Sequence, residues 1–258
     1  MMIAIAVIVA ALLRFPRSTM DSLSRGFGYS GLIATLTRVT HVVFRSLPST
    51  WPKRIVLVSN HESHLDGPAI QTSLKTRSIR YVAKEALFGI PFLGWGLKAA
   101  GNVSVSRAGN KSDYERLNES KERQEDGDVL FFAEGTRSRE GEFQPFKKGA
   151  FYFAILHQRP IVPIAVCGGF ESMRPGSLRP LGGEQAVCVG DPIDVSEYTL
   201  EDIDELRQRV RGEVEQLRLQ ALELIKSPRL DASVAQLGCE QREPFAFPLR
   251  PRQKTSAH

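Results

Sequence analysis

Short apolar runs alternate with helical stretches along much of this chain, and this alternation restricts the possible folds more than any other feature of the sequence. The first run, "IVLVS" at residues 55–59, is rich in β-branched residues and has the length of a buried strand. Helical stretches follow near 111–125 and 148–157, and residues 201–226 place apolar side chains at helical spacing. Strands that alternate with helices are typical of an α/β sheet with parallel pairs. We therefore predict an α/β fold with a mixed, largely parallel sheet flanked by helices. The predicted strands are 55–59, 80–83, 102–106, 129–133, 160–166 and 185–190.

The first 54 residues carry a local charge of +6, whereas the whole 258-residue chain has a net charge of +5. They open with twelve consecutive apolar residues, Met2–Leu13, which are too few to cross a bilayer because a spanning helix takes about 20. Residues 28–44 place apolar and basic side chains on separate helical stripes. We expect membrane-associated helices on an anionic lipid surface, and a helix packed on the domain core is the alternative. Nucleic acid is not expected as a partner, because nucleic-acid binders carry their basic residues across a folded face.

We expect three parts in the chain. Residues 1–48 form the apolar, amphipathic membrane-associated segment, 49–227 form the α/β domain, and 228–258 form a poorly ordered polar tail rich in Pro, Gln, Arg and Ser. The sparse cysteines have no ligand-like spacing, which indicates reduced thiols. We therefore expect a membrane-associated protein on the cytoplasmic face of the inner (plasma) membrane. The cysteines are Cys167, Cys188 and Cys239.

A polar cluster, "SNHESHLDGPAI" at residues 59–70, follows the first predicted strand. It brings His61 and Asp66 to the end of a buried strand, which is the edge where α/β sheets bind ligands. A zinc-protease helix needs histidines four residues apart, whereas His61 and His64 are three apart, so no metal site is expected. Two plainer interpretations stay open at this point. Asp66 could cap a helix of about ten residues that starts at Gly67-Pro68, and His61 could be an ordinary polar residue of the turn.

A second polar cluster follows the strand at 129–133, in "LFFAEGTRSREGEFQPFKKGAF". Its small and polar residues leave backbone N–H groups available, and the planar guanidinium of Arg137 matches the oxygens of a phosphate. Lys147 and Lys148 then fall at a predicted helix start, where anions are favoured. The alternative is a charged loop exposed to solvent.

Together these motifs resemble those of the glycerolipid acyltransferases, which include the 1-acylglycerol-3-phosphate acyltransferases. "NHESHLD" matches the family's histidine–four residues–aspartate motif, and "FFAEGTRS" matches its phosphate-binding motif. "GNVSVSR", ending in Arg107, resembles the motif that helps to bind the acceptor, and "PIVPIAV", with Pro163, resembles the apolar fourth motif. The resemblance covers residues 55–170. One departure is Ala133, where the family commonly has proline.

The resemblance implies a fold like that of glycerol-3-phosphate acyltransferase and the transfer of an acyl group to a lysophospholipid acceptor, 1-acylglycerol-3-phosphate. His61 would act as the general base, and Asp66 would hold its imidazole in the right tautomer. The co-substrate, acyl-CoA or acyl carrier protein, would supply a thiolate leaving group, so no cofactor or metal is expected. The residues that would bind the substrate are Lys84, Arg107, Glu134, Gly135, Thr136, Arg137 and Pro163.

Other functions stay open. The acceptor could be glycerol-3-phosphate or a lyso-lipid with a different headgroup, although the intact "EGTR" favours a phosphate. A membrane lipid-binding protein without catalytic activity is a further alternative, and the intact His61–Asp66 pair counts against it. An esterase is disfavoured because the sequence has no Gly-x-Ser-x-Gly elbow to supply a serine nucleophile.

Overall fold

The structure is a computed structural model that describes two stretches of the chain, 39–44 and 51–226. Both lie within the first of the chain's two compact units, Met1–Lys226. Of 39–44 only the backbone is described. The gaps within the second stretch are residues 53, 75–76, 107–110, 120–126, 139–141, 175 and 178–179.

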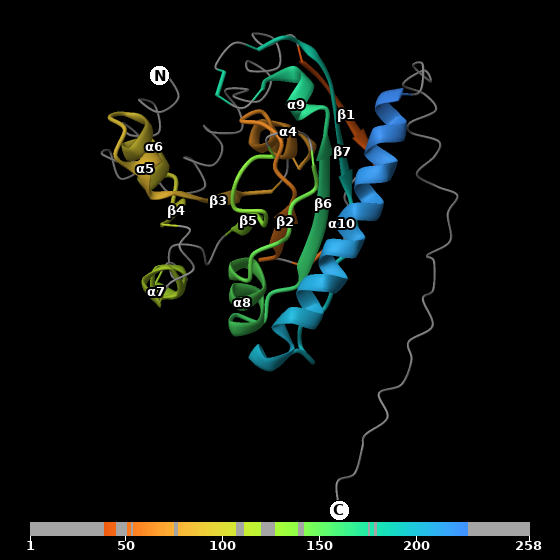
Figure 1. The fold of residues 1–258 in the computed structure, drawn as a ribbon. Coiled ribbons are helices and arrows are strands. Elements are labelled where there is room, and N and C mark those ends of the chain that lie inside the picture. Colours follow the sequence, from red (N-terminus) through yellow and green to blue (C-terminus); the bar gives the residue numbers. More distant parts are fainter. Residues whose placement is uncertain are drawn as a thin grey trace, which may run out of the picture. The chain divides into compact units, whose positions relative to one another are not determined.

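A seven-stranded sheet forms the centre of the described region, in the order β1-β7-β6-β2-β5-β3-β4 (Figure 1). Every neighbouring pair is parallel except β6 and β7, which are antiparallel. The predicted mixed, largely parallel sheet is therefore confirmed, and each of the six predicted strands is present. The strands are β1 (Val39–Phe44), β2 (Val56–Ser59), β3 (Ile79–Lys84), β4 (Val103–Val105), β5 (Asp128–Phe132), β6 (Ile161–Cys167) and β7 (Gly183–Val189).

Helices cover both faces of the sheet, which is why its central strands are apolar without interruption. Alternate residues of β2 point to opposite sides, so that Val56 and Val58 join one core while Leu57 joins the other. Helices α8 and α10 pack in the first core, and α4 packs in the second. Figure 1 shows α10 running along β6 and β7. The helices are α4 (Asp66–Ser73), α5 (Glu85–Phe88), α6 (Leu93–Ala99), α7 (Lys111–Glu119), α8 (Gly149–Leu156), α9 (Gly169–Ser172), the short 3-10 turn η2 (Leu200–Asp202) and α10 (Ile203–Lys226).

The helix predicted over residues 28–44 is wrong for its last part, because Val39–Phe44 form β1, which pairs in parallel with β7. Four of these six residues are β-branched, and such residues favour a strand where a neighbouring strand is available. The other predictions for the N-terminal segment and for the polar tail lie outside the described residues. No helix in the described ranges is long and apolar enough to span a bilayer.

The sheet topology gathers several segments at one edge. Strands β2, β5 and β6 are neighbours and run in the same direction, so their carboxyl ends meet there. Because β7 is antiparallel to β6, with Cys167 opposite Ala186, its first residues lie at that edge too. The segments that begin at His61, Glu134 and Gly169 and the side chain of Gln185 are thereby brought together, although they are far apart in the sequence.

Candidate active site

The chain leaves β2 through a loop that two side chains hold in place. Asn60 bonds the backbone of Val166 twice, its Nδ2 donating to the carbonyl at 2.7 Å and its Oδ1 accepting from the N–H at 2.8 Å. The Asn60 side chain thus replaces the backbone hydrogen bonds between β2 and β6 at the point where the backbone leaves the sheet. The backbone N–H of His61 then donates to Glu134 Oε1 at 3.2 Å, and the His61 carbonyl accepts from the N–H of Ser138 at 2.9 Å. The loop after β2 is thus bonded directly to the loop after β5.

His61 and Asp66 form a hydrogen-bonded pair. The imidazole Nδ1 lies 2.8 Å from Asp66 Oδ2, and the imidazole ring stacks on Phe132 with 3.9 Å between ring centroids. A carboxylate only accepts hydrogen bonds, so Nδ1 carries the proton and Nε2 is left as the basic nitrogen. The His61 side chain is 12% exposed, whereas that of Asp66 is fully buried. This arrangement suits a general base held in one tautomer.

Asp66 also binds the backbone of the loop that carries His61. Its Oδ2 accepts from the N–H groups of Glu62 at 2.7 Å and Ser63 at 2.8 Å, and its Oδ1 accepts from Gln185 Nε2 at 2.9 Å. Both backbone donors precede α4. The N-cap of α4 is Leu65, and no side chain caps that end of the helix. The alternative in which Asp66 serves only as a helix cap is therefore wrong.

Two further carboxyl groups lie buried beside this pair. Burial raises the pKa of Glu134 from its ordinary 4.5 to about 8, against the lowering effect of the hydrogen bond from the His61 N–H. Burial, followed by the negative charge of Asp66, raises the pKa of Glu62 to about 7. Glu62 is bonded by the N–H of Gly169 at 3.2 Å, and Arg218 of α10 lies 3.7 Å away. Glu134 could be expected at the site from its motif, whereas Glu62 could not, because its partners Gly169 and Arg218 are more than 100 residues away in the chain.

The loop after β5 begins with a tight turn. The Gly135 N–H donates to the carbonyl of Phe132 at 3.0 Å, and Gly135 has a φ of +74°, which favours glycine. A Cβ atom at Gly135 would lie 2.8 Å from the Cδ and Cε atoms of Lys147, so the lysine stem passes over this residue. Ala133, where the family commonly has proline, donates its N–H to the carbonyl of Ser59 at 2.9 Å. Proline lacks that donor.

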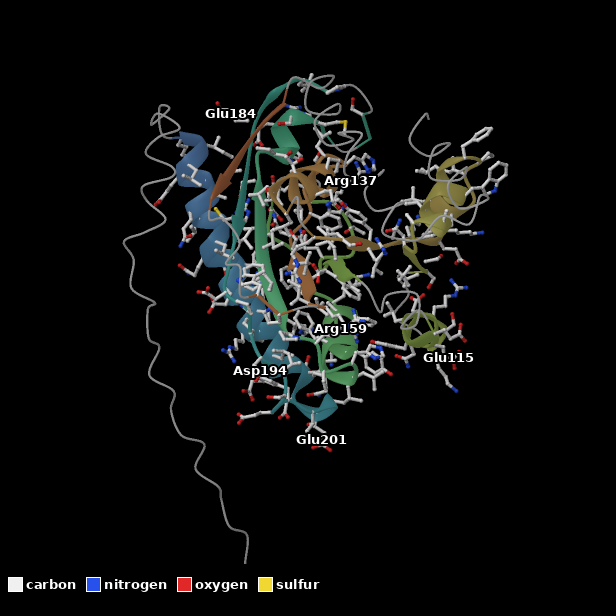
Figure 2. The ribbon with its side chains drawn as sticks, turned by 180° about the vertical axis from the view of Figure 1, so that it is seen from behind. Glu115, Arg137, Arg159, Glu184, Asp194 and Glu201 are labelled. Atoms are coloured by element: carbon white, nitrogen blue, oxygen red, sulfur yellow. The ribbon has the colours of Figure 1, made fainter. Side chains whose placement is uncertain are left out.

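Arg137 lies beside α4 at the same edge of the sheet (Figure 2). Its Nη1 is buried and has no hydrogen-bond partner among the described residues. Partial burial, then the positive charges of Arg137 and His61, lowers the pKa of His64. Three groups that bear or can acquire positive charge therefore lie close together, and this arrangement favours an anion.

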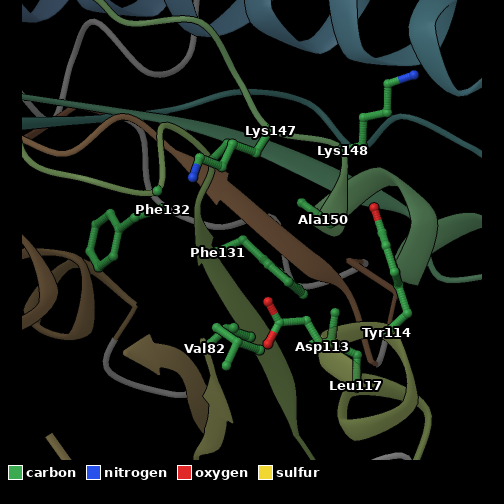
Figure 3. Close-up of a pocket in the computed structure, with 13 residues that line it drawn as sticks. Val82, Asp113, Tyr114, Leu117, Phe131, Phe132, Lys147, Lys148 and Ala150 are labelled. Carbon is green, nitrogen blue, oxygen red and sulfur yellow. The ribbon is translucent and has the colours of Figure 1, made fainter. Parts of the chain in front are cut away.

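A pocket of about 110 Å³ lies between the sheet and helices α7 and α8 (Figure 3). Phe132 is among the lining residues, but its ring, which stacks on His61, packs on the α4 side of the sheet, whereas the pocket lies on the side of α7 and α8. The oxygens of its one acidic residue, Asp113, accept from the N–H and hydroxyl of Ser106 at 2.6 and 2.8 Å. Most of the wall is apolar and is formed by Val82, Val105, Leu117, Phe131, Phe132, Ala133 and Ala150.

The structure brings together most of the predicted site residues, but not all of them. The segment from Glu134 to Arg137 meets the His61–Asp66 pair, and the exposed Lys84 ends β3 at the same edge of the sheet. Pro163 instead lies inside β6, opposite Val58, where its carbonyl accepts from the Gly190 N–H at 2.9 Å. Arg107 lies outside the described residues. No group of three or more His, Cys, Asp or Glu residues in the described part of the chain is placed to hold a metal ion.

The pattern of the acyltransferase family matches residues 39–167, which is half of the chain and includes both polar loops. The chain belongs to the acyltransferase family. A chloroplastic 1-acyl-sn-glycerol-3-phosphate acyltransferase of Brassica napus is 38% identical over 158 residues, 60% of this chain and 45% of that protein. A 1-acyl-sn-glycerol-3-phosphate acyltransferase of Haemophilus influenzae is 30% identical over 156 residues, 59% of this chain and 63% of that protein. The matched region thus spans about half the length of these relatives.

The fold of this acyltransferase-family chain also matches a solved structure. The crystal structure of the 1-acyl-sn-glycerophosphate acyltransferase PlsC from Thermotoga maritima superimposes with a TM-score of 0.70 at 23% identity. The match covers 87% of this chain and 89% of that one. At this level of identity, the likeness supports the fold.

Proposed function

We propose that this protein transfers an acyl group from a thioester, acyl-CoA or acyl carrier protein, to the free hydroxyl of 1-acylglycerol-3-phosphate, giving phosphatidate. The observation that carries the proposal is the 2.8 Å contact between His61 Nδ1 and the buried Asp66, made beside the cationic group around Arg137. The names of the two relatives described above support this choice of acceptor.

The proposed reaction follows from the basic nitrogen of His61. Nε2 accepts the proton of the acceptor hydroxyl as its oxygen attacks the thioester carbonyl carbon. The negative carboxylate of Asp66 stabilises the imidazolium that forms. The tetrahedral intermediate then collapses, the C–S bond breaks, and the thiolate takes the proton back from the imidazolium. The donor supplies its own leaving group, so the step balances without a redox partner.

Two different parts of the site would place the two substrates. Arg137 would hold the acceptor phosphate through its planar fork, and Lys84 and Arg107 would assist as further cations. The apolar pocket between the sheet and helices α7 and α8 would receive an acyl chain, since its wall offers few polar atoms that need a partner. Both contacts would bring the hydroxyl and the thioester carbonyl to the imidazole.

Arg137 provides the test of the acceptor. Phosphatidate formation should fall on replacing Arg137 with lysine and fall further on replacing it with alanine, with the loss mainly in kcat/KM because the phosphate positions the attacking hydroxyl. Both variants should be compared on lysophosphatidate and on a lyso-lipid without a terminal phosphate monoester. An equal loss on both acceptors would show that Arg137 does not read the phosphate. A panel of labelled acyl-CoA with glycerol-3-phosphate and other lyso-lipids distinguishes the remaining acceptors, and failure to form any acylated product would leave a non-catalytic lipid-binding protein.

A further inference from the structure

The turn between helices α5 and α6 exposes a cluster of large apolar side chains. Among the described residues, eight large apolar side chains are exposed, and four of these fall within residues 90–95. The other four are leucines distributed one each in α8, the segment before β7, η2 and α10. The cluster, called here the apolar turn, consists of Ile90 (46% exposed), Phe92 (48%), Leu93 (42%) and Trp95 (55%).

Helices α5 and α6 form a helical hairpin, and its backbone holds the four side chains of the apolar turn outward. A Cβ atom at Gly94 would lie 2.1 Å from the carbonyl oxygen of Phe88, so the two short helices approach as closely as their backbones allow. The Gly94 N–H also donates to the carbonyl of Ile90 at 2.7 Å, which closes the turn. Phe92 has a φ of +62°, a conformation that bulky residues rarely adopt and that persists where the surroundings fix it. Its ring packs edge-on against Trp95, 5.3 Å between centroids. The exposed cluster is therefore an ordered surface.

The position of the apolar turn and the charges beside it indicate what kind of partner it binds. Helix α5 begins directly after Lys84, the last residue of β3, so the hairpin lies at the same edge of the sheet as His61. Lys84 and Lys98 flank the apolar turn and are exposed, whereas the nearby Glu85 is engaged by Arg116 at 3.0 Å. Apolar and aromatic side chains bordered by lysines match a phospholipid surface with anionic headgroups.

A second protein copy fits this surface less well. A stable protein interface takes about 20 to 30 residues on each side, and the apolar turn offers four large side chains on one short hairpin. Insertion into a lipid interface needs no matching surface. We propose that the apolar turn inserts into the headgroup region of an anionic bilayer and so presents the edge of the sheet that carries His61 to the membrane. The choice of lipid as partner rests on the proposed function, because a lysophospholipid acceptor resides in the membrane.

Tryptophan fluorescence gives a local test in the full chain. The protein has two tryptophans, Trp51 and Trp95. Trp51 is partly buried, and its Nε1 has no hydrogen-bond partner among the described residues, so Trp51→Phe should fold normally and leave Trp95 as the single emitter. Vesicles of phosphatidylcholine and phosphatidylglycerol should shift the emission of Trp95 to shorter wavelength. Vesicles whose acyl chains are brominated should quench it.

Vesicle sedimentation adds a quantitative comparison. Trp95→Ala should lower the vesicle partition coefficient roughly 10-fold or more, as expected for removing one large side chain from an apolar environment. Leu219→Ala, a matched change at an exposed residue of α10 (51% exposed), should leave it unchanged. Residues 1–48 are themselves expected to bind lipid, so binding by Trp95→Ala should weaken without vanishing.

The outcomes separate the inference from the proposed function. Equal Trp95 emission with brominated and ordinary vesicles would overturn the inference. A blue shift that occurs without lipid and depends on protein concentration would also overturn it, since such a shift indicates that a second copy of the protein covers the apolar turn. Equal sedimentation of the Trp95 and Leu219 variants would also overturn it. Phosphatidate formation from a short-chain lysophosphatidate dispersed below its micellar concentration tests the function alone, so a protein could fail this assay while Trp95 still enters the bilayer.

Discussion

Replacing Asp66 with alanine and, separately, with asparagine should produce two different defects. The carboxylate accepts four hydrogen bonds, three at Oδ2 from His61, Glu62 and Ser63, and one at Oδ1 from Gln185. Two of the four donors are backbone N–H groups of buried residues, which cannot rotate away. The two substitutions therefore distinguish the role of Asp66 in holding the loop from its role in supporting the imidazole.

Alanine should reduce both stability and activity. It leaves the N–H groups of Glu62 and Ser63 without their acceptor, and each buried unsatisfied donor costs about 1–3 kcal/mol. The free energy of unfolding should therefore fall by about 2–6 kcal/mol, a large share of the roughly 5–15 kcal/mol of a typical domain.

Asparagine should preserve the loop and reduce mainly the rate. The two backbone donors favour an orientation in which the amide oxygen takes the place of Oδ2, which still accepts from His61 and keeps its tautomer. The amide nitrogen then faces Gln185, whose Oε1 is buried without a partner among the described residues and can turn to accept. What is lost is the charge. A charged partner strengthens a hydrogen bond by about 1–2 kcal/mol, so kcat should fall about 5- to 30-fold. This is less than the ~10⁴-fold loss in a serine-protease triad, where asparagine imposes the wrong tautomer.

Urea unfolding and initial rates of phosphatidate formation measure both effects on the same preparations. An asparagine variant as active as the wild type would show that Asp66 only organises the loop. An alanine variant as stable as the wild type would show that the two backbone N–H groups find other acceptors. A loss of ~10⁴-fold on asparagine would indicate that its amide nitrogen faces His61.

His61→Ala should lower turnover about 10²–10⁴-fold in a folded protein, as expected for the loss of a general base, whereas His64→Ala should do much less, and a reversed order in the acyltransferase assay would assign the base to His64. Glu62→Gln should change how stability depends on pH, because the pKa of about 7 means that the folded protein retains a proton which the unfolded chain releases near pH 4.5. As pH rises from about 4.5 to 7, the unfolding free energy of the wild type should therefore fall relative to that of Glu62→Gln, by up to about 3 kcal/mol. Urea unfolding of both proteins at pH 5 and pH 8 measures this, and the same difference in unfolding free energy at both pH values would contradict it. Gly94→Ala should cost about 1–3 kcal/mol through its clash with the Phe88 carbonyl, whereas Gly89→Ala, whose Cβ would approach nothing closer than 3.6 Å, should be tolerated in the same thermal unfolding assay.

The strands of the central sheet could be predicted from the sequence because both of their faces are buried. The three central strands, β2, β5 and β6, read as nearly continuous apolar runs, and this signal is local. β1 was missed because Val39 and Val43 are four residues apart, a spacing that also suits a helix. What decides in favour of the strand is pairing with β7, which starts at Gly183, and no local pattern contains that partner. The short helices α5 and α6 were missed for a related reason, since their apolar turn is exposed and gives no amphipathic pattern.

The candidate site shows the same division between local and distant information. His61 and Asp66 could be found because the chemistry needs both residue types close together, and the loop that carries them is short. Their supports could not be found in this way. Gln185, which bonds Asp66, is 119 residues away within a strand, and Arg218, which faces Glu62, belongs to a helix that reads as a charged surface. Arg107 and its motif lie outside the described residues, so its part in the acceptor site stays a prediction.

The three carboxyl groups around His61 occupy different environments, and this difference connects the fold to the proposed chemistry. Asp66 has four hydrogen-bond donors, whereas Glu134 has a buried Oε2 with no partner among the described residues and a pKa raised by burial to about 8. At neutral pH most Glu134 side chains are therefore protonated. A neutral Glu134 still accepts the N–H of His61, but it does not repel an anion bound three residues further along the loop at Arg137. Glu134 can thus fix the loop that carries the proposed base while leaving the positive charge of Arg137 available to the phosphate of the proposed acceptor.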